Sequence, residues 1–449
     1  MNIHGLARVV ILITNYFNLV TERVFVKTDS NMAAKLAGLV ISDRTVKGIT
    51  RKKVVVPPKE EGEKETMYWD YFLPSGKKIE DDERINDFNT LVVPPAWVDV
   101  WFNPNDRGHI QATGKDAKGR LQYRYHPEWN AVKADIKFSG IDEFAVVGLV
   151  EIRARVKDDL LVKGMPKFKS AALVIRLMDL YHIRVGSDQY AKENASYGLT
   201  TIKEGHLELL KGKKAIEGKI DAIFDFTGKS GKRWRLLIID DDIVSMIEES
   251  KKIGGDDDEQ DLFMYVDDNG NPRDLKAEHI NEYLDSCTDE ETKYTAKDFR
   301  TWAASWKTAH RLALISEATE EEINKIPELF EQSKKEVEGT AFEEYPMINW
   351  KGVNLKRVDG LSKLAKNNKI PGSNEKERLA SMLAVIDTVA GDLGNTRAVC
   401  RSSYIRPMVM TDWENQVFMD RWNSVKNMKK YPGLSKEESQ VFNYMHKYE

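Results

Sequence analysis

Four short segments carry polar residues whose types suit chemistry on a phosphate ester. YHIRVGSDQYAKENASYGLTT holds Arg184, FDFTGKSGKRW holds Lys229, AKDFRTWAAS holds Arg300, and GNTRAVCRSSYIRP holds Asn395 and Tyr404. Cutting a phosphodiester needs a nucleophile, a proton for the departing oxygen and donors for the two nonbridging oxygens. A tyrosine can supply the nucleophile, and a lysine held among other cations can supply the proton. Arginine suits the nonbridging oxygens because its planar fork donates two N–H groups to one phosphate.

Each of these residues also has an ordinary structural role available. Arg184 could simply be a cation at the C-terminal end of a helix, where positive charge is favourable. Lys229 suits a solvated turn residue, and Lys232 is an equal candidate for chemistry in the same turn. Tyr404 is one of 16 tyrosines, most of which must be core or surface aromatics. GKSG lacks the earlier glycine of a Walker loop, so the segment does not predict a nucleotide site.

In their order and local context, these segments resemble the active-site boxes of type IB DNA topoisomerases, most closely the short form of bacteria and poxviruses. IRVG…Y…EN…YGLTT resembles the first Arg box, FDFTGK the Lys hairpin, KDFRTW the second Arg box, and GNT…VCR.SYI.P the Tyr box. The resemblance implies Tyr404 as nucleophile and Lys229 as general acid. It implies that Arg184, Arg300 and Asn395 hold the nonbridging oxygens. Asn395 takes no proton-transfer role, because an amide is not an acid near neutral pH.

The resemblance also implies an activity, a binding partner and a cellular location. It implies relaxation of supercoiled duplex DNA through a 3′-phosphotyrosyl intermediate, with no metal, ATP or other cofactor. The implied partner is double-stranded DNA, bound by a monomer without a membrane or an obligatory protein partner. The expected location is intracellular, with the DNA: the cytoplasm or nucleoid of a bacterium, or a virion or viral factory.

Two alternatives stay open at this point. A tyrosine recombinase shares the Arg-Lys-Arg-Tyr chemistry, although recombinases usually carry a His two positions before the second Arg, where this chain has Asp298. The other alternative is a catalytically silent DNA-binding protein of the same fold.

A second set of residues is expected to contact DNA. PPAWVDVWF and RGHIQATGKDAKGRLQYRYHP resemble the family's DNA-facing sheet. Gln122, Tyr123 and Tyr125 alternate with Arg124, which predicts aromatic edges on one face of a strand and the cation on the other. Aromatic and amide groups read base edges or pack on sugars, while cations hold phosphates. Tyr190 matches a further DNA-contact position. Without the resemblance, an ordinary amphipathic strand is the better interpretation.

The elements around these residues predict an α+β fold. From Val40 to about Trp129, short alternating stretches predict a small β-rich domain with turns at Ser75-Gly76 and Lys118-Gly119. After about Asn130 the periodicity predicts a mostly α-helical catalytic domain with a small sheet whose turn lies at Gly228 to Gly231. The expected parts are an appendage (1–31, unless Met32 is the true start), a clamping domain (32–129), a catalytic domain (130–415) and a helical tail (416–449).

Two apolar patterns predict the helices that deliver the polar residues. One leads to Arg184 and the other to Asn395 and Tyr404. Their expected core residues are, for the first, Leu173, Ile175, Leu177, Met178 and Leu180, and, for the second, Leu379, Met382, Leu383, Ile386 and Ala390.

Residues 316 to 375 are expected to form an insertion in the catalytic domain. Thr319 and Glu322 have capping-box spacing, and the acidic first half predicts an amphipathic helix through Ile323, Ile326, Leu329 and Phe330. The basic second half either reaches phosphates or is a solvated surface; its cations are Lys351, Lys356, Arg357, Lys363, Lys366 and Lys369.

Composition excludes several other classes of protein. A chain of 449 residues is too long for one compact core. Two cysteines, and histidines without ligand spacing (His109, His126, His182 and His206), argue against a disulfide framework or a zinc site. Net charge is −4, but residues 101–240 sum to +7 and residues 241–300 to −12. Such blocks predict a polar face for a polyanion or simply a solvated surface. The apolar stretch from Val9 to Val20 is too short and too polar to span a bilayer.

Overall fold

The computed structural model describes residues 30–57, 65–212, 220–255, 257–288, 293–340 and 342–448. The chain divides into two compact units, one ending at Gly140 and the other beginning at Ile141. This division and the expected boundary after residue 129 both fall within one helix, α4 (Pro127–Glu143). Most of the expected appendage, including the apolar stretch from Val9 to Val20, lies outside the described residues.

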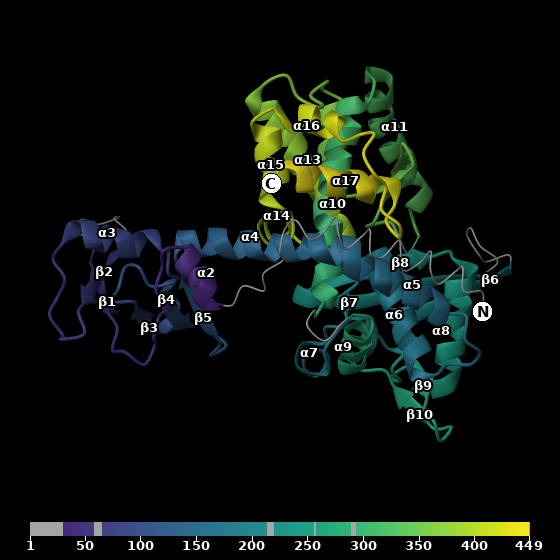
Figure 1. Ribbon diagram of the computed structural model, residues 1–449, viewed down its shortest axis with the longest axis horizontal. Helices are drawn as coiled ribbons and strands as arrows, with labels where there is room; N and C mark the ends of the chain where they lie inside the picture. The colour runs from purple at the N-terminus through teal and green to yellow at the C-terminus, as the bar shows by residue number, and fades with distance from the viewer. Residues whose placement is uncertain are drawn as a thin grey trace, which may run out of the picture. The chain divides into compact units, whose positions relative to one another are not determined.

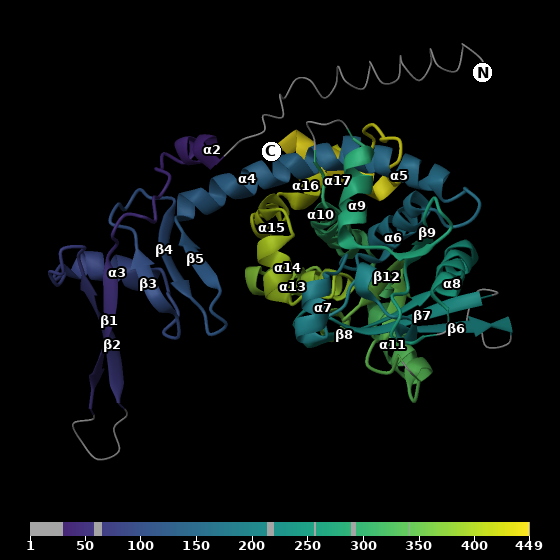
Figure 2. The same ribbon diagram turned by 90° about the horizontal axis from the view of Figure 1, so that it is seen from below.

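The first unit is built from two antiparallel sheets (Figure 2). Ile49, Tyr71, Phe88 and Phe102 form its core. The expected turns are present, since Gly76 and Gly119 have φ of +89° and +71°. The strands are β1 (Thr50–Val56) paired with β2 (Thr66–Phe72), and β3 (Val98–Phe102), β4 (Ile110–Lys115) and β5 (Leu121–Tyr125) in the order β3-β4-β5.

Two helices of this unit were not expected from a pattern of strands and turns. They are α2 (Ser30–Leu36) and α3 (Asp82–Thr90). Asp81 caps α3, because its side chain accepts a hydrogen bond from the Arg84 amide at 3.1 Å. The cap satisfies an N–H group that a helix start leaves unpaired, which is why this polar stretch is helical.

The second unit is mostly helical and carries a small antiparallel sheet in the order β6-β7-β8 (Figure 1). Its strands are β6 (Leu207–Lys211), β7 (Ile220–Gly228), β8 (Lys232–Ile238), β9 (Met264–Val266), β10 (Pro272–Asp274), β11 (Met347–Trp350) and β12 (Val353–Lys356). Its helices are η1 (Phe144–Gly148), α5 (Leu149–Asp159), α6 (Lys167–Tyr181), α7 (Asp188–Asn194), η2 (Leu199–Thr201), η3 (Glu204–His206), η5 (Lys229–Gly231), α8 (Asp241–Gly254), α9 (Ala277–Ser286), α10 (Ala296–Glu317), α11 (Glu320–Val337), α12 (Asp359–Ala365), α13 (Glu375–Asp392), α14 (Arg397–Ser403), α15 (Pro407–Glu414), α16 (Phe418–Ser424) and α17 (Lys436–Tyr448). The predicted α+β class is confirmed.

The two apolar patterns correspond to α6 and α13, with small corrections. Leu173, Ile175, Leu177 and Met178 are buried in α6, but Leu180 is 38% exposed. In α13, Met382, Ile386 and Ala390 are buried, Leu383 is half-buried, and Leu379 is 38% exposed. Both exposed leucines lie toward an end of their helix, where fewer neighbours cover an apolar side chain.

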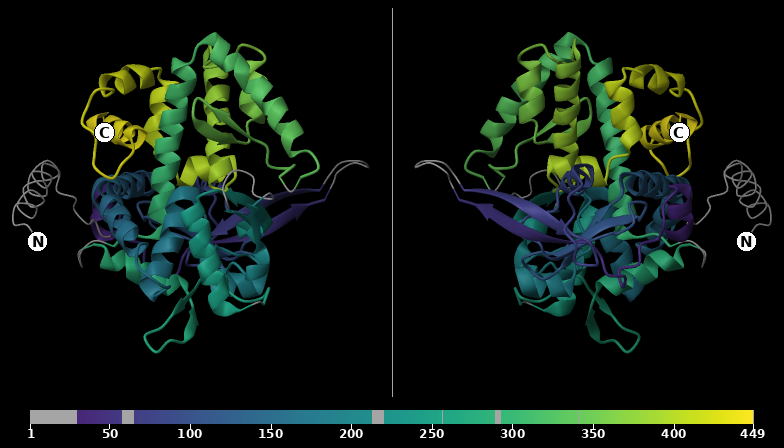
Figure 3. Two further views of the ribbon diagram at one scale, coloured as in Figure 1. Left: turned by 90° about the vertical axis from the view of Figure 1, so that its right-hand side faces the viewer. Right: turned by 90° about the vertical axis from the view of Figure 1, so that its left-hand side faces the viewer.

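Residues 316–375 fold against the helical body rather than forming a solvated excursion. The capping box is present, since Thr319 N donates to the Glu322 carboxylate at 2.8 Å and the Thr319 hydroxyl accepts from Glu322 N. α11 buries Ile323, Ile326 and Phe330. α11 packs on α12 and on β11, and α12 packs on α13, so these green and yellow-green segments stand side by side in Figure 3.

The C-terminal helices are also part of the packed core. In α17 the Glu438 carboxylate pairs with Arg153 at 2.9 Å, and the Tyr444 hydroxyl donates to Asp412 at 2.7 Å. Within the described ranges, no helix combines the length and apolar character needed to cross a bilayer.

Candidate active site

Four of the five residues expected to do chemistry meet in the second unit. Arg184 Nη2 donates to Asn395 Oδ1 at 2.6 Å, and Arg300 Nη2 lies 3.4 Å from the same oxygen. The Arg300 guanidinium lies over the Tyr404 ring, 5.4 Å from its centre. Three donors and one phenol, from three separate parts of the chain, therefore share one site.

Backbone geometry places Arg184 at this site. α6 ends at Tyr181, and His182 takes the left-handed conformation (φ +58°), which turns the chain out of the helix. The Arg184 carbonyl then accepts from Leu199 N at 2.9 Å. Gly198 allows this close approach, because a Cβ there would lie 2.6 Å from the Arg184 oxygen. Arg184 itself is half-buried, and burial lowers the pKa of its guanidinium.

Arg300 ties three elements together from the buried face of α10. It is 3% exposed, and its Nη2 donates to the Leu393 carbonyl at 2.7 Å while Nη1 donates to the His182 carbonyl. Burial, followed by the charge of Arg184, lowers the Arg300 pKa, yet a guanidinium stays protonated in proteins. Arg300 therefore holds the end of α6 and the end of α13 at fixed positions around one positive charge.

Asn395 presents an unused donor between the arginines. Asn395 follows Gly394, whose φ of +59° turns the chain out of α13. The backbone N–H of Asn395 donates to the Ala390 carbonyl at 2.9 Å. Its Oδ1 accepts from both arginines, whereas its Nδ2 is buried without a hydrogen-bond partner among the described residues. A buried unpaired N–H is costly, so this group is poised to donate to a ligand oxygen.

The backbone at and after Tyr404 is fixed by hydrogen bonds to one serine side chain. Tyr404 follows α14, the Ser305 hydroxyl donates to its carbonyl at 3.2 Å, and the same hydroxyl accepts from Arg406 N at 3.0 Å. Arg406 is buried, and its two terminal guanidinium nitrogens, Nη1 and Nη2, donate to the Asp142 carboxylate. These contacts deliver Tyr404 to the site although residues 316–375 lengthen the chain between it and Arg300.

The electrostatics of the site favour an ionised phenol. Burial alone raises the pKa of Tyr404, but the positive charges of Arg300, Arg184 and Lys297 outweigh burial, and the pKa is lowered. A lowered pKa makes tyrosinate, the nucleophilic form of the side chain, easier to reach.

The fifth expected residue, Lys229, is not in contact with the other four. It lies exposed at the tip of the β7–β8 hairpin in η5, and no hydrogen bond or ion pair joins it to another described residue. Lys232, at the start of β8, is closer to the site. Burial and the charges of Arg357 and Arg184 lower the pKa of its ammonium.

The expected DNA-contact residues occupy both faces of β5 in the first unit. Tyr123 and Tyr125 are exposed and stacked, with ring centres 5.7 Å apart. Arg124 lies on the other face, where it donates to the Val92 carbonyl at 2.9 Å. Gln122 shares the Arg124 face, so its expected place beside the tyrosines is wrong, because side chains alternate along a strand. In the second unit, Tyr190 is 51% exposed on α7.

A buried ionic cluster behind the site was missed in the sequence. Asp392 Oδ2 accepts from Lys307 at 2.8 Å and Arg311 at 2.6 Å, which joins α10 to the end of α13. Burial raises the Asp392 pKa, but these cations and Lys356 outweigh burial and lower it. Lys307 and Arg311 lie four residues apart and therefore on one helix face, and this spacing is the sequence feature that could have indicated the cluster.

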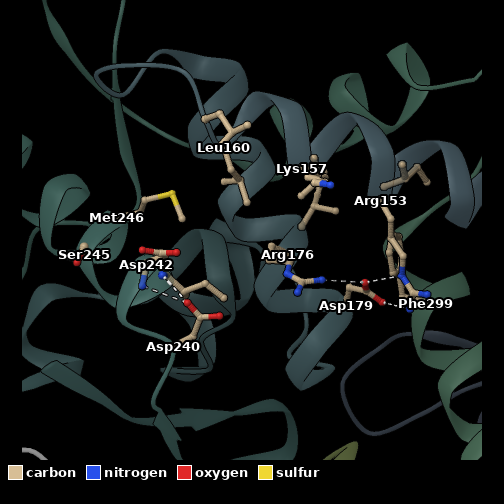
Figure 4. Close-up of a pocket in the computed structure, with 15 residues that line it drawn as sticks. Arg153, Lys157, Leu160, Arg176, Asp179, Asp240, Asp242, Ser245, Met246 and Phe299 are labelled. Atoms are coloured by element: carbon tan, nitrogen blue, oxygen red, sulfur yellow. Dashed lines mark hydrogen bonds and ion pairs between the residues drawn. The ribbon is translucent and has the colours of Figure 1, made fainter. Parts of the chain in front are cut away.

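One cavity of the second unit belongs neither to the candidate site nor to the ionic cluster around Asp392. About 660 Å³ in volume, it is lined by parts of α5, α6 and α8, and none of the five expected residues lines it. At one end Arg153 and Arg176 face Asp179 (Figure 4). Across the described ranges, no three His, Cys, Asp or Glu side chains are grouped so as to hold a metal ion.

Asp298, which stands where recombinases usually carry a His, has a structural task. Its carboxylate accepts from Thr295 N at 2.7 Å and from the Thr295 hydroxyl at 2.9 Å at the start of α10. The residue caps the helix that carries Arg300.

Comparison with known proteins identifies the family. Residues 130–431 match the model of the eukaryotic DNA topoisomerase I catalytic core, and residues 68–116 match that of the bacterial DNA topoisomerase IB N-terminal domain. The chain is 28% identical over 241 residues to a DNA topoisomerase 1B of Acanthamoeba polyphaga mimivirus. That match covers 52% of this chain and 66% of the viral protein, slightly less than two thirds. Because the catalytic-core match spans more than half of the chain, the protein belongs to the type IB DNA topoisomerase family.

Proposed function

We propose that the protein relaxes supercoiled duplex DNA by transient cleavage of one strand. The observation that carries the proposal is the meeting of Arg184, Arg300 and Asn395 beside the Tyr404 phenol, in a chain of this family.

In the proposed reaction the Tyr404 oxygen attacks the scissile phosphorus. A bond forms between phosphorus and the phenol oxygen, the bond to the 5′-oxygen breaks, and a 3′-phosphotyrosyl link remains. The phenol proton is lost to solvent before or during attack, a loss that the lowered Tyr404 pKa favours. Religation reverses these steps after the downstream duplex has rotated, and it needs no ATP because the covalent link conserves the bond energy.

Charge on the nonbridging oxygens is stabilised by groups that are already in place. Arg184 and Arg300 supply positive charge, and the unpaired Asn395 Nδ2 supplies a further N–H donor. Donors fixed before the reaction stabilise developing charge without reorganising, so cations of the protein can serve where other enzymes use a metal.

Lys229 is the proposed proton donor to the 5′-oxygen. Its exposed position at a hairpin tip means that it must approach the site when DNA is bound. Ser230 and Gly231, both at positive φ, follow it in this short turn. Lys232, already influenced by Arg184, is the alternative donor.

The proposed partner is double-stranded DNA, bound by a monomer inside a cell or virus particle. The exposed stack of Tyr123 and Tyr125 offers flat surfaces for sugars or base edges, with the Arg44 guanidinium 5.9 Å from the Tyr123 ring centre. Tyr190 is a proposed contact because it is 51% exposed. Gln122 is half-buried and donates to Asp116 at 3.0 Å, so it is a proposed contact only by the resemblance. Arg124, engaged with Val92 and lying over Trp97, orients the strand.

Plasmid relaxation in EDTA without ATP tests the proposed function. The unsubstituted protein should relax both negative and positive supercoils and form a covalent adduct with DNA. Tyr404→Phe should do neither. Tyr265→Phe, which removes a hydroxyl from β9, is the matched control and should relax normally. A strict need for a divalent metal, or an adduct with Tyr404→Phe, would overturn the proposal.

A further inference from the structure

Arg357 occupies an unusual backbone position in the segment between Arg300 and Tyr404. It follows β12 directly and adopts φ of +52°, the left-handed region that an arginine rarely enters. Such a conformation is strained for a residue with a side chain and persists only where surrounding contacts hold it, often at functional sites. The contacts of the side chain show what holds it here.

The Arg357 side chain reaches the backbone of a site residue. Its Nη1 donates to the Asn395 carbonyl at 2.6 Å. The stem runs across Gly391 of α13, where an added Cβ would lie 3.3 Å from Cγ and 3.4 Å from Cδ of Arg357. A glycine at this point therefore leaves room for the arginine to cross the helix and reach Asn395.

Arg357 differs from most neighbouring cations in having no carboxylate partner among the residues that the structure describes. Lys351, Lys366 and Lys369 pair with Glu322, Glu331 and Glu377. Lys356 lies by the buried Asp392. Arg357 is exposed, and within the described ranges it makes no ion pair. A guanidinium has five N–H groups, and the contact with Asn395 uses one of them.

We propose that Arg357 is a sixth residue of the site, a further cation supplied by residues 316–375. It positions Asn395 through the backbone carbonyl, and its remaining N–H groups bind a phosphate oxygen of the DNA strand beside the scissile phosphate. The proximity of Arg357 to Lys232, and of Lys232 to Arg184, supports one continuous cationic surface. This inference rests on the proposed function, since it names a further contact of the same site.

Single-turnover cleavage at saturating DNA tests the positioning role. Arg357→Ala should slow cleavage by about tenfold or more, because Asn395 loses its anchor. Arg357→Ala combined with Asn395→Ala should be no slower than Asn395→Ala alone, because the two residues act as one unit. Lys335→Ala removes an exposed cation from α11 of the same segment, one that forms no ion pair with any described residue, and this variant should cleave normally. Normal cleavage by Arg357→Ala, or additive effects in the double variant, would overturn the positioning role.

DNA binding tests the phosphate contact without requiring cleavage. In a Tyr404→Phe background, Arg357→Ala should reduce the slope of log affinity against log salt by about one phosphate contact, whereas Lys335→Ala should leave it unchanged. An unchanged slope for Arg357→Ala would overturn the contact. If the unsubstituted protein forms no covalent adduct, the proposed function fails, and this binding measurement still decides whether Arg357 holds a phosphate.

Discussion

Substituting Gly198 with alanine should displace Arg184 and slow cleavage. An added Cβ would lie 2.5 Å from Gly186 N and 2.6 Å from the Arg184 carbonyl oxygen, both rigid backbone atoms. Ordinary contact begins at 3.4 Å, so relieving the 2.5 Å approach to Gly186 N requires the two chain segments to separate by about 0.9 Å. This separation strains the hydrogen bond from Leu199 N to the Arg184 carbonyl, now 2.9 Å.

The expected magnitudes differ for stability and for catalysis. Overpacking of this kind costs about 1–3 kcal/mol of unfolding free energy. A shift of about 1 Å in a site residue costs about 10²-fold in rate, or about 2.7 kcal/mol of barrier. Single-turnover cleavage at saturating enzyme measures the rate, and urea unfolding measures stability.

Gly140→Ala provides the matched control for this prediction. Gly140 lies in α4 with no atom within 4 Å of an added Cβ, so alanine there should leave cleavage unchanged and stabilise the helix slightly. If Gly198→Ala is folded and cleaves within about threefold of the unsubstituted protein, the close approach does not position Arg184 and the reasoning is refuted.

Three further predictions concern protons and buried charge. Lys229→Ala should cleave an ordinary substrate slowly and recover on one with a 5′-sulfur leaving group, which needs no proton; recovery of Lys232→Ala instead would assign the acid to Lys232. In the free protein, difference absorbance between the unsubstituted chain and Tyr404→Phe should show a tyrosine ionising below the ordinary pKa of about 10. Arg184→Ala should raise that pKa, and an unshifted titration would contradict the electrostatic argument. Asp392→Asn should lower the unfolding free energy at neutral pH by about 3–5 kcal/mol. Because folding lowers the Asp392 pKa, its contribution is present above the ordinary carboxyl pKa and is lost as pH falls through the folded value, so urea unfolding should show the difference fade in acid.

Local patterns in the sequence predicted most of the elements and the order of the site segments. The capping box at Thr319 and Glu322, the turns at Gly76 and Gly119, and the alternation of Tyr123 and Tyr125 about Arg124 are all present. Each depends on residues within a few positions of one another, so a short stretch of sequence contains the whole physical cause. Gln122 is the exception: it was grouped with the tyrosines, but it lies two positions before Arg124 and therefore shares the Arg124 face.

The arrangement of Arg184, Arg300, Asn395 and Tyr404 was decided only by tertiary packing. Arg184 and Asn395 are 211 residues apart, and their contact depends on how α6, α10 and α13 pack. The same holds for the pairing of Asp392 with Lys307 and Arg311, and for the path of Arg357 across Gly391. Sequence periodicity says which face of a helix is buried, but not which distant side chain meets it there. The residue types for this chemistry could therefore be recognised in the chain, whereas their common site, and the arginine that joins it from residues 316–375, appear only when the helices are packed.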